Sequence, residues 1–415
     1  MFKLLFLSAT FATLAFPQSD FHLKSGDVVV FYGDSITDQK MYTVMVETYV
    51  RTRFPKLNVK FVHSGWGGDT VNGGGGGGID ERLKRDVIRY KPTVMTIMLG
   101  MNDGRYRAFD QNIFDTYSKG YEHILDVMKR TLPELRVTLV QPSPYDDVTR
   151  APTFTGGYNA VLLKFSDYLK ELSTKRGTTL ADLNHPLVSV LEKAKINDEK
   201  GAQAIVPDRV HPGWGGHLIM GQSLLRAWNA PSLVSSVEID GKAGRLQSSS
   251  KTQVSELVSG TDGYHWKQND ESLPMPLPVP ATLPGLMLAV KSSDFQESMN
   301  RQILLVKNAM AAKYQLKING ASVGEFTAAE LSQGINLAEK ETPMMKQARE
   351  VFALTVKRTN IHNMRWRQLE IPMGSENLGS LPSILDSLNE LRDELEARQI
   401  AAAQPGSTRY DLIAQ

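Results

Sequence analysis

Residues 28–37, VVVFYGDSIT, place the strongest constraint on how this chain can fold. The unbroken apolar start is typical of a strand buried on both faces, as in a parallel sheet. Gly33 can adopt the backbone angles of a sharp turn, and a helix is expected over about residues 41–54. Ser35 would then lie just beyond the carboxyl end of a strand, where open α/β sheets bind ligands. The serine is therefore a candidate nucleophile, although a serine before a helix is more commonly its N-cap.

The same alternation of strand and helix continues along the first half of the chain. Short apolar runs predict further strands, and amphipathic stretches between them predict helices. The strands are expected at about 59–63, 93–99, 135–141 and 179–183, and the helices at about 79–90, 113–131, 157–175 and 217–228. Alternating units of this kind imply a parallel sheet covered on both faces. Residues 20–231 are therefore expected to form one α/β domain.

The second half of the chain has a different pattern. Residues 232–373 contain alternating strand-like runs, a proline-rich connector at 273–284 and a helical stretch near 341–357. These features predict a smaller accessory α+β module. Residues 374–415 are more polar, and we expect a tail with one amphipathic helix at 382–403 and a disordered end.

The N-terminus indicates export. Residues 1–19 resemble a signal peptide, with Lys3 ahead of an apolar core at 4–16 that is too short to span a bilayer. The expected location is the periplasm or the outside of the cell. The chain has no cysteine, so it can form no disulfide and carries no lipid-attachment cysteine. The net charge of +2 gives no reason to expect binding to nucleic acid or an anionic membrane, and no later run is long and apolar enough to span one.

Three further segments bring polar residues to the carboxyl ends of the predicted strands or to a later loop. SGWGGDT at 64–70 offers backbone donors at Gly67 and Gly68. The six glycines at 73–78 that follow are either a mobile surface loop or backbone packed close to a ligand, and the mobile loop is the favoured expectation. GMNDG at 100–104 supplies Asn102, and PDRVHP at 207–212 supplies an aspartate and a histidine. Acyl transfer requires a serine, a histidine base, a carboxylate that orients it and donors for an oxyanion. The segments contain all of these groups.

Four of these segments together resemble the sequence blocks of the SGNH (GDSL-type) esterase/lipase family, in the family's order. They are GDSIT at 33–37, GWGGDT at 65–70, GMND at 100–103 and DRVH at 208–211. The resemblance implies that Ser35 is the nucleophile, His211 the general base and Asp208 its orienting carboxylate. It assigns the oxyanion hole to Ser35, Gly68 and Asn102. The implied fold is a flavodoxin-like three-layer α/β/α sandwich of five parallel strands, with no metal and no cofactor. Residues 232–415 lie outside the resemblance.

The resulting hypothesis is an exported serine esterase for short-acyl carboxylic esters, with O-acetylated carbohydrate as the favoured substrate class. The loops around the site are rich in glycine, which offers no apolar wall to a long acyl chain. Trp66 and Trp214 flank the site and could stack on a sugar ring, or they could simply pack the loops. The oligomeric state is left open.

Two other hypotheses come from different classes. The first is a non-catalytic carbohydrate-binding or surface interaction protein built on an SGNH-like domain. The second is a metal-dependent phosphodiesterase, with Asp34, Asp69 and Asp103 joined by His211 or His217 around an ion. Each of these aspartates can instead hydrogen-bond the backbone of its own loop. His63, at a strand end, is expected to be a structural histidine.

Overall fold

The computed structural model describes residues 21–278, 280 and 282–415. The predicted signal peptide at 1–19 lies outside the described residues. No helix within the described part of the chain combines the length and apolar character needed to cross a bilayer.

The first domain is built on one sheet of five parallel strands in the order β2-β1-β5-β6-β7. The strands are β1 (Val28–Gly33), β2 (Lys60–Gly65), β5 (Val94–Met98), β6 (Arg136–Val140) and β7 (Thr179–Ala181). β1 lies inside the sheet, and its residues 29–32 are completely buried. Strands that are covered on both faces are apolar along most of their length. For this reason the unbroken apolar runs in the sequence predicted where these strands lie. The order is that of a flavodoxin-like fold, so the predicted fold class is confirmed.

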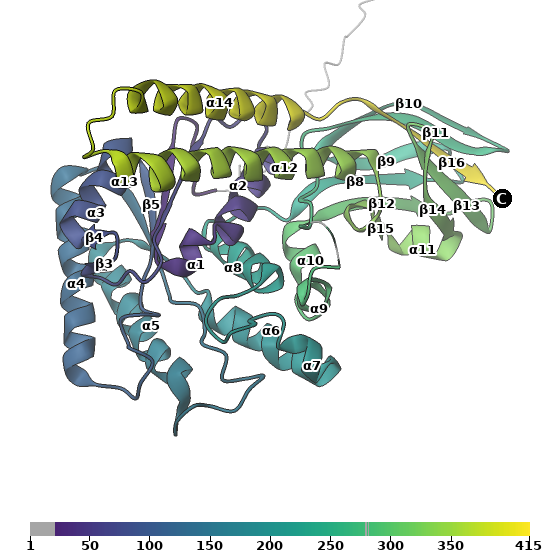
Figure 1. Cartoon of the computed structure of the whole chain (residues 1–415). Coiled ribbons are helices and arrows are strands. Elements are labelled where there is room, and N and C mark those ends of the chain that lie inside the picture. Colours follow the sequence, from purple (N-terminus) through teal and green to yellow (C-terminus); the bar gives the residue numbers. More distant parts are fainter. Residues whose placement is uncertain (1–20, 279, 281) are drawn as a thin grey trace, which may run out of the picture.

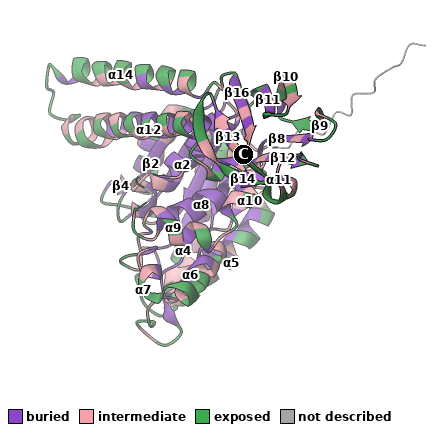
Figure 2. Cartoon of the chain, turned by 90° about the vertical axis from the view of Figure 1, so that its right-hand side faces the viewer, coloured by how far each residue is buried: buried purple, intermediate pink, exposed green. Residues whose placement is uncertain are grey.

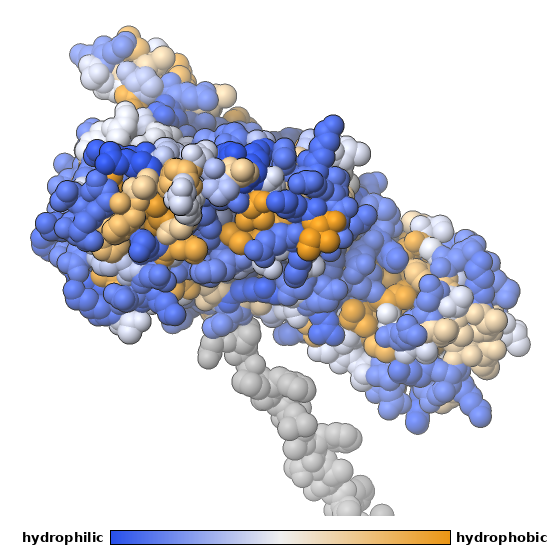
Figure 3. All heavy atoms as spheres, turned by 90° about the horizontal axis from the view of Figure 1, so that it is seen from below, coloured by the Kyte–Doolittle hydropathy of each residue, from blue (hydrophilic) through white to orange (hydrophobic). Residues whose placement is uncertain are grey.

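Helices cover both faces of this sheet (Figure 1). One side carries α1 (Ser35–Asp38), α2 (Met41–Arg53) and α8 (Trp214–Ala227), and the other carries α4 (Gln111–Thr131) and α5 (Gly157–Arg176). The remaining helices of this domain are α3 (Ile79–Asp86), a 3-10 turn at Ile88–Tyr90, α6 (Asn184–Asn197) and α7 (Glu199–Ala202). Helix α8 is buried along most of its length, as Figure 2 shows. The face seen from below is largely hydrophilic, with scattered apolar side chains (Figure 3).

The run of six glycines forms a hairpin and not a mobile loop, which corrects the sequence-based expectation. β3 (Gly73–Gly74) pairs antiparallel with β4 (Gly77–Gly78) directly before α3. Gly73 and Gly77 have φ angles of 87° and 115°, which side chains other than glycine rarely adopt. Gly76 packs so close to the Trp66 indole that a Cβ atom would lie 2.5 Å from the ring. Glycine is therefore needed here for a tight turn and a close approach.

The second half of the chain forms two sheets that share one apolar core. The first sheet contains β8 (Leu233–Asp240), β9 (Arg245–Ser250), β12 (Arg301–Lys307) and β15 (Ile335–Asn336). The second contains β10 (Thr252–Gly260), β11 (Gly263–Asp270), β13 (Lys313–Ile318), β14 (Ala321–Thr327) and β16 (Thr408–Ala414). Val237 and Leu304 of the first sheet and Trp266 and Leu412 of the second belong to the same buried cluster. Short helices accompany them: α9 (Leu286–Lys291), α10 (Phe295–Met299), α11 (Ala328–Gln333) and a 3-10 turn at Leu337–Glu339.

The end of the chain, expected to be disordered, is the middle strand of the second sheet. β16 pairs antiparallel with β11 on one side and with β13 on the other. Before it, α12 (Pro343–Asn363) continues into a π-helical turn (Met364–Glu370) and α13 (Ile371–Met373), and α14 (Leu381–Ala402) runs back. Figure 1 shows α12 and α14 lying across the first domain. The polar tail therefore crosses the first domain and completes the accessory sheet.

Candidate active site

Ser35 is the first residue of the four-residue helix α1, and one residue, Asp34, separates it from the carboxyl end of β1. The cap of this helix is Asp34, whose Oδ1 accepts the Ile36 N–H at 3.0 Å. The hydroxyl of Ser35 is therefore not the helix cap. As the first helical residue, Ser35 also has an N–H with no acceptor in a preceding helical turn.

The structure brings Ser35, His211 and Asp208 into one hydrogen-bonded chain. His211 Nε2 lies 2.9 Å from Ser35 Oγ, and His211 Nδ1 lies 2.7 Å from Asp208 Oδ2. The other carboxylate oxygen, Oδ1, accepts the N–H groups of Val210 at 3.0 Å and His211 at 2.7 Å. Arg209, between them, has a φ of 72°. This tight turn fixes the aspartate relative to the histidine, so two residues three apart in sequence can face each other.

The surroundings of Asp208 favour its anionic form. Burial by itself would raise the pKa of this carboxyl, but hydrogen bonds from His211 and Val210 hold the pKa below its usual value. An anionic carboxylate accepts the proton on Nδ1 of His211. The neutral ring then presents Nε2 as an acceptor toward the Ser35 hydroxyl.

Two potential oxyanion donors lie on neighbouring loops. Gly68 is exposed with a φ of 80°, and its N–H has no hydrogen-bond acceptor among the described residues. Asn102 donates through Nδ2 to the carbonyl of Asp69 at 3.0 Å, and its Oδ1 accepts the hydroxyl of Tyr106 at 3.0 Å. An amide nitrogen carries two hydrogens, so the second N–H of Asn102 is available to a ligand.

Tyr106 was not identified from the sequence. It orients Asn102 from a loop in which Arg105 and Tyr106 have φ angles of 55° and 54°. Consecutive left-handed residues other than glycine are uncommon and are concentrated at functional sites. No pattern in the sequence signals this conformation.

Neither tryptophan is placed to stack on a ligand in the cavity around Ser35. Trp66 is only 5% exposed and lies among the side chains of Arg82, Arg85 and Arg367. Trp214 is half-buried and packs edge-to-face on Phe352 of α12, with ring centroids 5.8 Å apart. Stacking of a sugar on Trp66 is therefore excluded by its burial, and packing is the role that both rings have in this structure.

The aspartates beside the site each have partners in the protein. Asp69 Oδ2 accepts Arg82 Nε at 2.7 Å, and Asp103 Oδ1 accepts the Val71 N–H at 2.9 Å. Burial, together with the charges of neighbouring aspartates, raises the pKa of Asp34 and of Asp103 to about 7. Within the described residues, no three or more His, Cys, Asp or Glu side chains are arranged to hold a metal ion.

The two other histidines of interest are buried. His217 pairs through Nε2 with Gln39 at 2.8 Å, and burial lowers its pKa to about 3. His63 contacts Thr43 at 2.6 Å and Glu47 at 3.2 Å, so it is a satisfied structural histidine as predicted. His217 is therefore neutral near pH 7.

Ser35, Asp208 and His211 line a cavity of about 430 Å³. Five further residues complete its wall: Asp38, Gln39, Lys40, Asn363 and Arg367. All eight lining residues are polar or charged. Asn363 and Arg367 come from the C-terminal half of the chain, far from the four sequence blocks, and no sequence motif pointed to them.

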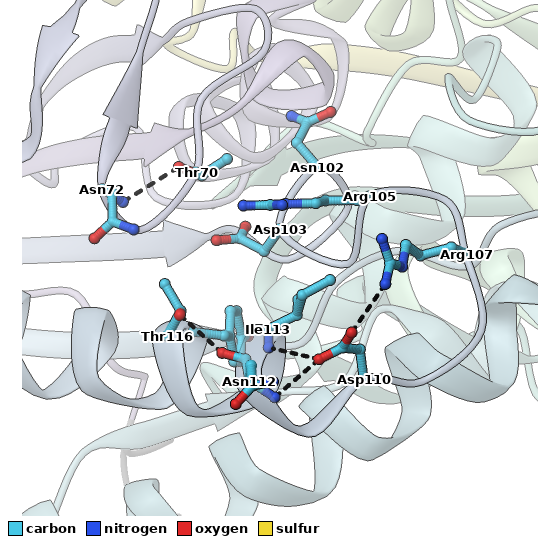
Figure 4. Close-up of a pocket in the computed structure, with 11 residues that line it drawn as sticks. Thr70, Asn72, Asn102, Asp103, Arg105, Arg107, Asp110, Asn112, Ile113 and Thr116 are labelled. Carbon is cyan, nitrogen blue, oxygen red and sulfur yellow. Dashed lines mark hydrogen bonds and ion pairs between the residues drawn. The ribbon is translucent and has the colours of Figure 1, made fainter.

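A second cavity of about 260 Å³ lies beyond Asn102 (Figure 4). It is also polar, and Arg107 on its rim pairs with Asp110 at 2.9 Å. Asp103 lies in its wall. Because Asn102 lines it, this cavity lies beside the candidate oxyanion hole.

The first half of the chain is similar to known proteins. Residues 31–219 match the GDSL-like lipase/acylhydrolase family. An acetylxylan esterase from Geobacillus stearothermophilus is 25% identical over 222 residues, which are 49% of this chain and 94% of that protein. The solved structure of that organism's acetylxylan esterase aligns with a TM-score of 0.41 at 22% identity, covering 50% of this chain and 96% of that one.

The accessory half also has a counterpart of known structure. A gut microbial diltiazem-metabolizing enzyme superposes with a TM-score of 0.83 at 23% identity, covering 95% of this chain and 98% of that one. The overall fold, including the two accessory sheets and the C-terminal helices, is therefore shared with a solved structure.

The sheet order and the residues at the carboxyl ends of its strands define a hydrolase of the SGNH class. Residues 31–219 are a domain of the GDSL-like lipase/acylhydrolase type, and the protein is an ester hydrolase.

Proposed function

We propose that this protein is an exported serine esterase that removes short acyl groups from acylated carbohydrate. The observation that carries the proposal is the hydrogen-bonded chain from Asp208 through His211 to Ser35, with the histidine 2.9 Å from the serine oxygen. The distance is within the reach that a general base needs to take the serine proton.

The first half of the reaction forms an acyl-enzyme. His211 Nε2 takes the proton of Ser35 as Oγ attacks the ester carbonyl, and the carboxylate of Asp208 stabilises the imidazolium that results. The protonated histidine then gives its proton to the alkoxide of the departing alcohol, and the acyl group stays on Ser35.

The second half regenerates the enzyme. His211 takes a proton from water, which attacks the acyl carbon, and the histidine returns that proton to Ser35 as the carboxylic acid leaves. In both halves a negative charge develops on the carbonyl oxygen. The N–H groups of Ser35 and Gly68 and the free N–H of Asn102 would stabilise that charge.

The proposed acyl group is short because no side chain of an apolar residue lines the cavity. Each methylene of an acyl chain gains about 0.8 kcal/mol only when it leaves water for an apolar surface. The eight residues that line the cavity around Ser35 are all polar or charged. The carbohydrate part of the proposal is supported by the relative named as an acetylxylan esterase.

The test is hydrolysis of p-nitrophenyl esters from acetate to octanoate, followed by acetate release from acetylated sugars. We expect kcat/KM to be highest from acetyl to butyryl and to fall for longer chains. Ser35→Ala should abolish most of kcat, whereas Ser383→Ala, an exposed serine on α14, should behave as wild type. An organophosphonate probe should label Ser35. Labelling of another serine with loss of activity, or an optimum at octanoyl, would contradict the proposal.

Export is tested separately, by the N-terminal sequence of the protein recovered from cells that express the full chain. Cleavage near residues 17–19 is the expected result. An intact Met1 in the mature protein would contradict it.

A further inference from the structure

The cavity around Ser35 receives two side chains from the C-terminal half of the chain. Asn363 is the last residue of α12, and Arg367 lies in the π-helical turn that follows. Lys40, just before α2, lines the same cavity from the hydrolase domain. Two cations, Lys40 and Arg367, therefore line the cavity that holds the candidate nucleophile.

The π-helical turn is held in place from both sides. Trp366 is 1% exposed, and its Nε1 donates to Asp86 Oδ1 at 2.7 Å. Glu370 accepts two hydrogen bonds from Arg89, at 2.9 and 3.1 Å. π-Helical turns are rare and are found frequently at functional sites. The backbone that carries Arg367 is thus fixed against the hydrolase domain on either side of this residue.

The guanidinium of Arg367 lies over the indole of Trp66, 3.1 Å from the ring centroid. No carboxylate of the described residues lies within 4 Å of it. The two other arginines on the same indole are paired: Arg82 with Asp69 at 2.7 Å and Arg85 with Asp86 at 2.7 Å. Arg367 is half-buried, and arginines that are taken out of water are normally paired with an anion.

The carboxylates of the cavity already have partners. Asp38 lies 3.8 Å from Lys40, whose ammonium also donates to the Asp38 carbonyl at 2.6 Å. Asp208 is engaged by His211 at 2.7 Å. Arg367 is therefore the cation whose hydrogen-bond donors remain for a ligand that enters beside Ser35.

We propose that Arg367, assisted by Lys40 and Asn363, binds a carboxylate on the alcohol part of the ester, so that the enzyme prefers acylated acidic sugars over neutral ones. The proposal rests on the esterase function proposed above. A planar guanidinium matches a carboxylate through two parallel hydrogen bonds, and stacking on Trp66 fixes the orientation of its plane. The carboxylate is placed on the alcohol because the acyl groups of the proposed function, acetyl to butyryl, carry none.

The test compares acetate release from mono-O-acetylated galacturonate and from galactose acetylated at the same position. The wild type should have the higher kcat/KM for the acidic sugar. In Arg367→Gln the ratio of the two values should fall about 10- to 100-fold, the worth of a hydrogen-bonded ion pair. Arg367→Lys, which keeps the charge but not the planar fork, should give an intermediate ratio.

Arg365→Gln is the matched control, since it removes the same charge from the same helical turn. Arg365 pairs with Glu370 at 2.7 Å and does not line the cavity. Its ratio should equal that of the wild type. An unchanged ratio in Arg367→Gln, or an equal fall in Arg365→Gln, would overturn the proposal.

A second measurement separates this proposal from the esterase function. Free galacturonate should inhibit hydrolysis of p-nitrophenyl acetate competitively in the wild type, and about 10-fold or more weakly in Arg367→Gln. If p-nitrophenyl acetate is hydrolysed but galacturonate inhibits both proteins equally, the carboxylate site is refuted and the esterase stands. If neither the p-nitrophenyl esters nor the acetylated sugars are hydrolysed, the esterase function itself fails.

Discussion

Asn102 and Asp103 are adjacent in sequence but have different surroundings. Asn102 is half-buried at a cavity rim and keeps one N–H for a ligand, because Asp69 and Tyr106 use its other amide atoms. Asp103 is 8% exposed, and its Oδ2 has no hydrogen-bond partner. Asn102 can therefore donate a hydrogen bond to a ligand. Asp103 holds its loop by accepting the Val71 N–H, and burial makes the ionised form of its carboxyl unfavourable.

Asn102→Ala should lower kcat by about 10²–10³ with little change in KM, because an oxyanion donor acts mainly in the transition state. Steady-state kinetics on p-nitrophenyl acetate measures both constants. Tyr106→Phe removes only the hydroxyl that orients Asn102, so its loss of kcat should be smaller. A rise in KM at constant kcat for Asn102→Ala would make this residue a ground-state binding group.

Asp103→Asn should be stabilising at alkaline pH. Burial raises the pKa of Asp103 to about 7 in the folded protein, whereas the unfolded chain has the ordinary value near 3.8. Between these values the folded state binds the extra proton, so the free energy of unfolding falls as pH rises from about 4 to 7. The asparagine does not titrate, so the free energy of unfolding of the variant relative to the wild type should rise by on the order of a few kcal/mol over this range. Urea unfolding of both proteins at pH 5 and pH 8 gives the difference. An equal difference at the two pH values would show that Asp103 ionises normally.

At the scale of secondary structure, the elements with strong local signals were predicted well. Helix α2 was predicted to end one residue after its observed end, and the strand predicted at about 93–99 is observed as β5 at Val94–Met98. The glycine hairpin and β16 were not predicted. A run of glycines has no side chains from which a pattern can be recognised, and β16 exists only because β11 and β13 offer it free edges on both sides.

Gly76→Ala should destabilise the protein by about 1–3 kcal/mol, because its Cβ would lie 2.5 Å from the Trp66 ring in a packed site. Gly78→Ala is the control in the same hairpin. Gly78 has a φ of −66° and nothing within 4 Å of its Cβ position, so its substitution should change stability by about 0.5 kcal/mol or less. Chemical unfolding would measure both. Equal effects would mean that the hairpin does not pack on Trp66.

At the scale of the whole molecule, a buried charge network joins the C-terminal helices to the hydrolase domain. Glu47 of α2 is completely buried and accepts hydrogen bonds from Arg358 of α12 at 2.5 Å and from Gln399 of α14 at 3.0 Å. Burial opposes the ionisation of Glu47, but Arg358 and His63 lower its pKa to about 2. The network fixes α12, and through it the turn that carries Arg367.

Glu47→Gln should cost about 3–5 kcal/mol, because it leaves the guanidinium of Arg358 buried without its counter-charge. The double variant Glu47→Leu/Arg358→Met removes both charges and should lose clearly less than the single variant. Denaturant unfolding of the three proteins gives these values. A double variant as unstable as Glu47→Gln would show that packing, and not charge, holds α12 in place.

The sequence by itself determined the five-strand hydrolase sheet and placed Ser35, Asp208 and His211 at one site. These features are encoded locally, in apolar runs of strand length and in turns only a few residues long, and parallel strands bring their carboxyl ends to one edge. Only the tertiary structure decided that Trp66 is covered, that the chain end completes a sheet, and that Arg367 lines the cavity beside Ser35. Each of these depends on contacts between residues far apart in the chain, and such contacts leave no periodic pattern around either partner.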